Sequence, residues 1–302
     1  MTNAPAQTPA GVSPSAMSSA APMAPGSTAT FVGSKVCATC HGRQTQTFRT
    51  TKMGQLFLDN PHHENQQAGC ETCHGPGSAH VARPRRDDGG PNSIMAFRAD
   101  SPRPVRTRNA VCLTCHEEGE RTHWQGSAHQ NRDLACTDCH RVMDKVSPVA
   151  QLSKPTEIQV CTTCHADRRA QMFRSSHMPL REGAMTCSTC HQPHGTPNMS
   201  LLRTATPNET CFTCHADKRG PFLFEHPPVR ENCMTCHDPH GSINANLLTV
   251  ASPRLCQQCH SEATHPSMPQ DPLSIYAFNR GCQNCHGQVH GSNSPSGARL
   301  HR

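Results

Sequence analysis

The pattern Cys-x-x-Cys-His recurs ten times in this chain of 302 residues and accounts for all 20 of its cysteines. Two thiols at this spacing lie on one side of a helical turn, where they can add to the two vinyl groups of one porphyrin. The histidine that follows then presents a ring nitrogen to the iron. The sequence therefore predicts ten covalently bound haem c groups, one at each motif.

We number the motifs 1 to 10 along the chain. The first cysteines are Cys37, Cys70, Cys112, Cys136, Cys161, Cys187, Cys211, Cys233, Cys256 and Cys282. The second cysteines are Cys40, Cys73, Cys115, Cys139, Cys164, Cys190, Cys214, Cys236, Cys259 and Cys285. The predicted proximal iron ligands are His41, His74, His116, His140, His165, His191, His215, His237, His260 and His286.

Two other chemistries use closely spaced cysteines: structural zinc sites and disulfide frameworks. A single motif would leave both open. Ten copies, each with the histidine in the same place and with no cysteine left over, exclude them. Because haem c is attached on the oxidising side of a membrane, we expect the protein to be exported.

The composition is too polar for an ordinary core. Apolar residues make up 34% of the chain, with one tryptophan and one tyrosine, so the porphyrins themselves must fill the interior. We expect a multihaem cytochrome c fold that is mostly irregular, with short α-helices, little or no β-sheet, and folding that depends on haem. The formal net charge of +6 is mild and does not indicate nucleic-acid binding.

Internal repetition supplies the second axial ligands. Residues 161–195 and 211–241 each hold two motifs and two further histidines at similar positions, and other stretches of the chain vary this unit. The predicted distal ligands from this repeat are His80, His129, His177, His194, His226, His240, His265 and His290.

Two of these histidines, His194 and His240, lie only three residues after a proximal histidine. So short a segment reaches about 10 Å when extended, which hardly allows it to pass around a porphyrin to the opposite face of the same iron. We therefore expect both to ligate a neighbouring haem.

Two methionines stand where the repeat predicts a ligand. Met143 lies three residues after His140, at the position of His194 and His240, and its rival as a ligand is His123. Met53 lies 12 residues after His41, as His177 does after His165. Thioether ligation favours ferrous iron and raises the potential relative to two histidines.

The assignment of Met53 is open, because a second alignment places Lys52 opposite His177, and His62 or His63 could complete the first haem instead. Either methionine could also be simple packing. We expect His301, near the end of the chain, to be solvated.

The start of the chain, residues 1–30, is rich in alanine, proline, serine and threonine and has almost no charge. We interpret it as a disordered leader. It lacks the cationic and apolar segments of a signal peptide, so we expect that an export signal was removed. No run of apolar residues approaches the length needed to span a membrane as a helix.

Several longer stretches carry a specific resemblance: CETCHGPGSAH, WQGSAHQNRDLACTDCH, CFTCHADKRGPFLFEHPPVRENCMTCHDPHGS, LCQQCH and CQNCHGQVHGSNSPSG. Over residues 31–302 the chain resembles the periplasmic decahaem cytochromes of outer-membrane electron conduits, of the MtrA, MtoA and PioA type with the DmsE branch. The resemblance implies two pentahaem domains, here 31–175 and 176–302, in a rod with the haems in line. It also implies a periplasmic protein held inside an outer-membrane β-barrel porin.

Family members commonly have histidine where Met53 and Met143 stand. Methionine at these positions, with the N-terminal extension, best fits a PioA-like subtype, in which electrons move inward from extracellular Fe(II). The implied partners are the porin, periplasmic electron carriers and an extracellular cytochrome or Fe(II). The alternatives are outward respiration of metals or dimethyl sulfoxide, and a soluble periplasmic shuttle. We expect no enzymatic site, because no motif ends in lysine and every motif ends in histidine.

Overall fold

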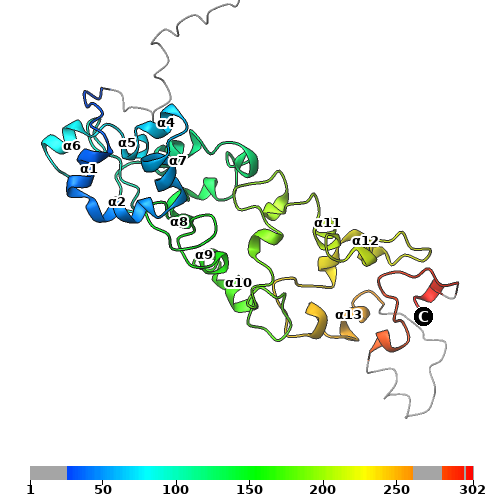
Figure 1. The fold of residues 1–302 in the computed structure, drawn as a ribbon. Coiled ribbons are helices and arrows are strands. Elements are labelled where there is room, and N and C mark those ends of the chain that lie inside the picture. Colours follow the sequence, from blue (N-terminus) through cyan, green and yellow to red (C-terminus); the bar gives the residue numbers. More distant parts are fainter. Residues whose placement is uncertain (1–25, 261–280, 296, 302) are drawn as a thin grey trace, which may run out of the picture. The chain divides into compact units, whose positions relative to one another are not determined.

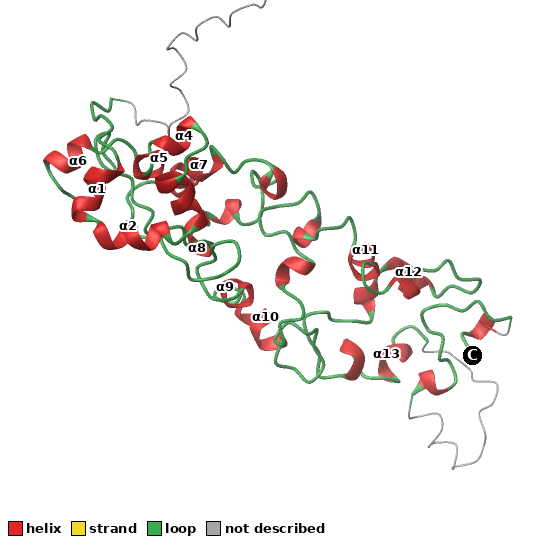
Figure 2. Ribbon diagram, in the orientation of Figure 1, coloured by secondary structure: helices red, strands yellow, loops and turns green. Residues whose placement is uncertain are grey.

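The computed structural model describes residues 26–260, 281–295 and 297–301. His265 and most of the predicted leader lie outside this part of the chain. Within it, short helices are joined by long loops and no strand is present (Figure 2). The predicted fold class, mostly irregular with short α-helices, is confirmed. In the same residues, no helix is long and apolar enough to cross a membrane.

The described chain divides into two compact units. The first contains residues up to Glu118 together with Asp133–Pro155, and it carries motifs 1 to 4. Its elements are α1 (Ser34–Cys40), α2 (Gly42–Arg49), α3 (Lys52–Gly54), the π-helix η1 (Gln55–Asp59), α4 (Glu64–Gln67), α5 (Cys70–His74), α6 (Ser78–Ala82), α7 (Val105–Leu113) and α8 (Cys136–Cys139). Helix α1 contacts α2 and α5 (Figure 1).

The second unit contains Gly119–Arg132 and the chain from Thr156 onward, with motifs 5 to 10. Its α-helices are α9 (Glu157–Cys161), α10 (Ala166–Gln171), α11 (Pro207–Phe212), α12 (Pro227–Glu231) and α13 (Arg254–Gln257). Its 3₁₀ turns are η2 (Gly119–Arg121), η3 (Gln130–Arg132), η4 (Cys187–Thr189), η5 (Met199–Leu201), η6 (Ala216–Lys218), η7 (Cys233–Thr235), η8 (Ala245–Leu247), η10 (Cys282–Asn284) and η11 (Gly297–Arg299).

Local sequence explains where the helices that carry motifs 5 and 7 begin. Thr156 caps α9 by accepting a hydrogen bond from the Gln159 N–H, and the Gln159 side chain accepts one from the Thr156 N–H. The Thr206 hydroxyl caps α11 by accepting a hydrogen bond from the Glu209 N–H, and Pro207 follows at the first helical position, where its missing N–H costs nothing. These caps place each motif at the end of a helix.

A loop of one shape follows several of the even-numbered motifs. Isolated antiparallel bridges close it between His140 and Leu152, between His191 and Leu202, and between His237 and Leu248. Residues near its end adopt the left-handed conformation, which fixes the turn back toward the motif: Ala150, Gln151, Ser200, Leu201, Asn246 and Leu247. The bridge and the left-handed residues therefore fix the backbone of the loop that follows each of these three proximal histidines.

Few apolar side chains are buried in the described residues: Ala29, Phe48, Val111, Trp124, Ala135, Leu152, Val160 and Met172. Large apolar side chains elsewhere remain exposed, among them Met199 at 89% and Ile243 at 78%. So small a core does not account for a fold of this length. This agrees with the expectation that haem, and not side chains, fills the interior.

Candidate haem-binding sites

Each motif forms one helical turn. In nine of the motifs the histidine N–H donates to the carbonyl oxygen of the first cysteine at 2.9–3.1 Å, and motif 2 lies inside α5. This turn puts both thiols and the histidine ring on one side of the backbone. The local geometry is therefore the one that attachment of a porphyrin requires.

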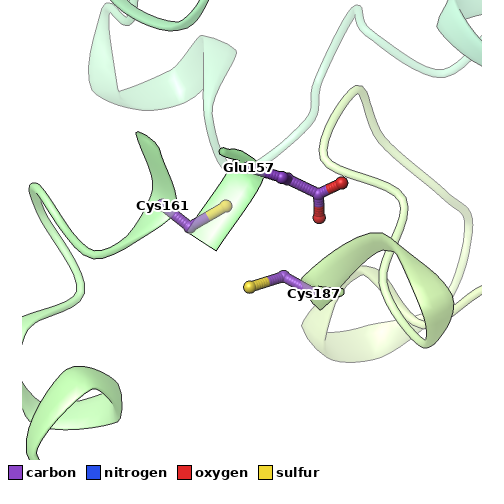
Figure 3. A group of neighbouring side chains, drawn as sticks. All are labelled: Glu157, Cys161 and Cys187. Atoms are coloured by element: carbon purple, nitrogen blue, oxygen red, sulfur yellow. The ribbon is translucent and has the colours of Figure 1, made fainter. Parts of the chain in front are cut away.

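Consecutive motifs meet in pairs through their first cysteines. In the second unit, the Sγ atoms of Cys161 and Cys187 face each other, with the carboxylate of Glu157 beside them (Figure 3). Thiols of the same kind interact in the other pairs: Cys37 with Cys70, Cys112 with Cys136, Cys211 with Cys233, and Cys256 with Cys282. Before haem is attached, burial, followed by the neighbouring Cys70, raises the pKa of the free Cys37 thiol to about 11.

The group of Glu157, Cys161 and Cys187 has the donor atoms of a metal site, but its chemistry is different. Both thiols belong to haem motifs, and Glu157 is already engaged. Its two carboxylate oxygens accept from the Ser188 N–H at 2.6 Å and from the Ser188 hydroxyl at 2.7 Å. We therefore interpret Glu157 as a structural residue that holds motif 6 against motif 5.

A polar side chain with this role occurs in three more pairs, which sequence reasoning did not find. Each lies three residues before the first cysteine of one motif and accepts a hydrogen bond from the first N–H of the next motif. They are Ser34 to Cys70 (3.0 Å), Asn109 to Cys136 (2.9 Å) and Asn208 to Cys233 (2.7 Å). A polar residue recurs three positions before these odd-numbered motifs, and this spacing is the sequence signal that could have predicted the contact.

The second cysteines join one pair of motifs to the next. In the first unit, burial raises the pKa of Cys73 to about 11, and the nearby thiol of Cys115 adds to this effect. In the second unit, Cys190 lies near Cys214, and Cys236 lies near Cys259. Within each unit, consecutive motifs therefore approach each other alternately at their first and second cysteines.

Five pairs of histidine rings lie at the separation that a shared iron requires. A metal to imidazole nitrogen bond is about 2 Å long and the ring centre lies about 1 Å beyond the nitrogen, so two axial rings have centres about 6 Å apart. The observed centres are 6.2–6.4 Å apart in the pairs His41/His80, His129/His165, His191/His240, His226/His260 and His237/His290. These rings fit haem ligation.

Hydrogen bonds at the other ring nitrogen orient many of these side chains. Nδ1 donates to a backbone carbonyl oxygen in His191 (to Ser200, 2.7 Å), His237 (to Asn246, 2.8 Å) and His226 (to Val289, 2.9 Å). This bond fixes the tautomer and leaves the lone pair of Nε2 for the metal. These histidines therefore fit axial haem ligation through Nε2, with Nδ1 held by the backbone.

In each of the five pairs, one ring is the proximal histidine of a motif and the other belongs to a histidine outside that motif. His240, which follows motif 8, faces His191 of motif 6, and not the proximal histidine three residues before it. This is the arrangement that the short spacing predicts for His240.

The structure does not bring all predicted ligands together. The Nε2 atom of His177 lies 3.2 Å from Glu182. His265 is outside the described residues, and His194 stays a predicted ligand. The ring of His301 lies edge-on against His286, with centres 4.4 Å apart, which differs from our expectation of a solvated residue.

The candidates for the first haem also differ from expectation. The ring opposite His41 is that of His80, whereas we expected Met53, Lys52, His62 or His63 there. Lys52, His62 and His63 are exposed, and Met53 is half-buried. His123, the rival of Met143, is exposed in the second unit, and Met143 itself is 37% exposed.

Comparisons with known proteins agree with the motif geometry. Two segments, residues 177–220 and 226–265, match the family described as "Doubled CXXCH motif", and residues 70–164 match "Cytochrome c-type protein NrfB-like". The chain is 42% identical over 279 residues to the "Multiheme cytochrome MtrA" of Shewanella baltica (strain OS185), covering 89% of this chain and 81% of that protein.

A second relative matches over a shorter stretch. The chain is 26% identical over 147 residues to the "Cytochrome c-type protein NrfB" of Escherichia coli O6:H1 (strain CFT073), covering 48% of this chain and 72% of that protein. The longer match, the doubled motifs and the paired rings point the same way. The chain is a multihaem c-type cytochrome with covalently bound haem, and it belongs to the MtrA family.

Proposed function

We propose that this chain conducts electrons across the outer membrane through ten covalently bound haems. The observation that carries the proposal is the alternating approach of consecutive motifs at first and second cysteines, because it brings each attachment site close to the next within a unit, as where the Cys161 and Cys187 Sγ atoms lie within 4.8 Å of each other. Electron transfer needs only such closeness. It needs no open iron, and we propose that the chain has no catalytic site.

The ring pairs assign axial ligands to haems. We propose that five of the haems have two histidine ligands: motif 1 with His80, motif 5 with His129, motif 6 with His240, motif 8 with His290 and motif 9 with His226. His177, His194 and His265 are further distal ligands, which these ring pairs leave without an assigned iron.

One further assignment follows from spacing. His129 and His226 each lie seven residues before an even-numbered motif and face the proximal histidine of the next odd-numbered one. His63 lies seven residues before motif 2, so by the same rule it serves motif 3, with Met53 as its rival.

The similarity to MtrA supports a place inside a porin in the outer membrane, facing the periplasm, with periplasmic electron carriers on one side. We propose two pentahaem domains, 31–175 and 176–302, as the frame of this conduit. Methionine at positions 53 and 143 favours the PioA-like subtype, in which electrons flow inward from Fe(II) or an extracellular cytochrome. Outward respiration and a soluble shuttle are the alternatives.

The test is conduction across a lipid bilayer. The tagged holoprotein is purified from outer membranes with whatever barrel protein accompanies it, and the complex is placed in vesicles that enclose ferricytochrome c. Fe(II) added outside should reduce the enclosed cytochrome. A matched control carries Cys211→Ser with Cys214→Ser and lacks the haem of motif 7, so it should conduct far more slowly.

Three results separate the alternatives. If no barrel protein accompanies the chain, the shuttle reading replaces the conduit. If the control conducts as fast as the natural chain, the haems do not act in series and the proposal is wrong. If Fe(II) gives no reduction but enclosed reduced methyl viologen is oxidised by external Fe(III), the conduit stands and its direction is outward.

A further inference from the structure

We infer that Met143 is the distal ligand of the haem attached at motif 2, opposite His74. This inference rests on the ligand pairs proposed above and names the iron that the methionine serves. It makes motif 2 a haem with one nitrogen and one sulfur ligand in a chain whose other assigned members have two nitrogens.

The first step is the register of the ring pairs in the second unit. His240, after motif 8, faces His191 of motif 6, and His290, after motif 10, faces His237 of motif 8. In both cases the distal ligand follows an even-numbered motif and serves the even-numbered motif before it. In the first unit the even-numbered motifs are 2 and 4.

The second step is the local fold around Met143. After motif 4, the His140 Nδ1 donates to the Ala150 carbonyl oxygen at 2.8 Å, and the Arg141 N–H donates to the Gln151 carbonyl oxygen at 2.6 Å. The equivalent distances after motif 8 are 2.8 Å, from His237 to Asn246, and 2.8 Å, from Asp238 to Leu247.

The two loops therefore start and close in the same way. The residue three positions beyond the proximal histidine is Met143 in one loop and His240 in the other. The loop after motif 4 is one residue longer before its closing bridge, and the turn in which the Gly241 N–H donates to the Asp238 carbonyl oxygen at 3.2 Å belongs to the loop after motif 8. The register from the second unit then assigns Met143 to motif 2.

The third step is the state of His74. Its Nδ1 donates to the Met95 carbonyl oxygen at 2.7 Å, which leaves Nε2 for iron, as in His140, His191, His237 and His286 of the other even-numbered motifs. Among the described residues, the one aromatic ring in contact with His74 is that of Phe97, edge-on with centres 5.5 Å apart. No described histidine ring lies opposite His74 as His80 lies opposite His41, so the second position is open to a residue of another type.

The chemistry fits a thioether. Methionine sulfur is a soft, neutral donor that suits haem iron, and Met143 has the length and flexibility to reach it. The 37% exposure of Met143 is compatible with this role because the porphyrin it would contact fills space that the side chains leave. A haem with this ligand stays reduced at potentials where its neighbours with two histidines are oxidised.

The test uses the oxidised holoprotein and near-infrared magnetic circular dichroism, in which the sulfur-to-iron charge-transfer band is separate from the band of haems with two histidines. Met143→His should remove the sulfur band of one haem and add one haem to the other band. Met143→Leu should instead give one high-spin haem by electron paramagnetic resonance.

Two controls isolate the effect. Met199→His changes a methionine that is 89% exposed in the loop after motif 6, and it should leave both bands unchanged. Met53→His tests the other candidate: if Met53 were also a ligand, this substitution would remove a second share of the sulfur band. If Met143→His leaves the sulfur band intact, Met143 is not a ligand and the inference is wrong.

A structure of the holoprotein identifies the iron. The expected result is the Met143 Sδ bonded to the iron of the haem on Cys70 and Cys73. Sulfur bonded to the haem of motif 4 would overturn the inference while the ligand pairs stand. If His240 is found on an iron other than that of motif 6, the proposed pairs themselves fail.

Discussion

The loops that follow motif 4 in the first unit and motif 8 in the second unit close in the same way and carry different side chains three residues after the proximal histidine. Both return to their motif through the same bridge and hydrogen bonds. One presents a methionine and the other a histidine. In the ligand set proposed above, the loop fixes where a ligand is offered, and a single side chain sets the electronic character of the haem that receives it.

A second difference lies one residue further on. Gly195, Gly241 and Gly291 follow a histidine in the second unit, and all have positive φ. A Cβ on Gly241 would overlap the Gln171 carbonyl oxygen. In the methionine loop, Asp144 stands at this position, without a positive φ. At these glycines the histidine loops lie so close to another segment of their unit that a Cβ would overlap it.

The largest change should come from removing a ligand of the second unit. His240→Ala takes away the imidazole that faces His191, so the iron of motif 6 should become five-coordinate and high-spin. Electron paramagnetic resonance of the oxidised protein measures this. Ile243→Ala is the control, since that side chain is 78% exposed two residues beyond the loop's glycine, and a low-spin spectrum for His240→Ala would refute the pair.

A reciprocal exchange tests whether the two loops are interchangeable. His240→Met should convert motif 6 to one nitrogen and one sulfur ligand and raise the potential of one haem by a sizeable part of the roughly 0.8 V that axial ligands span. Spectropotentiometric titration of the variant measures this shift. An unchanged titration would mean that the loop does not bring residue 240 to an iron.

The difference at this position predicts a larger loss of stability from substitution in the histidine loop than in the methionine loop. Gly241→Ala should lower the free energy of unfolding by about 2 kcal/mol, because the new Cβ is strained at φ 137° and overlaps the backbone of Gln171. Asp144→Ala should change it much less. Chemical denaturation followed by Soret absorbance compares the two, and equal losses would contradict the difference in packing.

The polar side chains that hold motif pairs together should contribute similar amounts to the free energy of unfolding in both units. Asn208→Ala removes the acceptor for the Cys233 N–H and the donor to the Val229 and Arg230 carbonyl oxygens. Leaving those groups unpaired should cost about 1–3 kcal/mol. The same denaturation experiment on Asn109→Ala, in the first unit, should give a comparable loss.

The smallest effect concerns acid stability of the first unit. Burial alone would raise the pKa of Asp87, but hydrogen bonds from Ala96, Gly89 and Ser93, together with Arg103, lower it below its ordinary value. An aspartate with a lowered pKa in the folded state stabilises the protein above the unfolded pKa of about 4 and loses this contribution as the pH falls through the folded pKa.

Melting of the natural chain and of Asp87→Asn between pH 7 and pH 3 measures this contribution. The difference between the two should be greatest at neutral pH and shrink in acid. A difference that stays constant across the range would show that ionisation of Asp87 does not contribute.

Much of the haem chemistry could be read from the sequence. The covalent attachment of haem and the small apolar core of the described residues follow from motif spacing and composition, because a turn of helix places Cys, Cys and His on one side whatever surrounds it. The fold class followed for the same reason. Short helices bear the motifs and loops connect them.

Which histidine rings face each other was decided by tertiary structure. His240 could be predicted to leave its own motif, since three residues cannot span a porphyrin, but the sequence could not select His191 of motif 6 as the ring it faces. His80, Ser34 and Asn208 act across distances in the chain that no local pattern records. Their roles depend on how separate turns pack, and packing brings together residues that sequence spacing leaves independent.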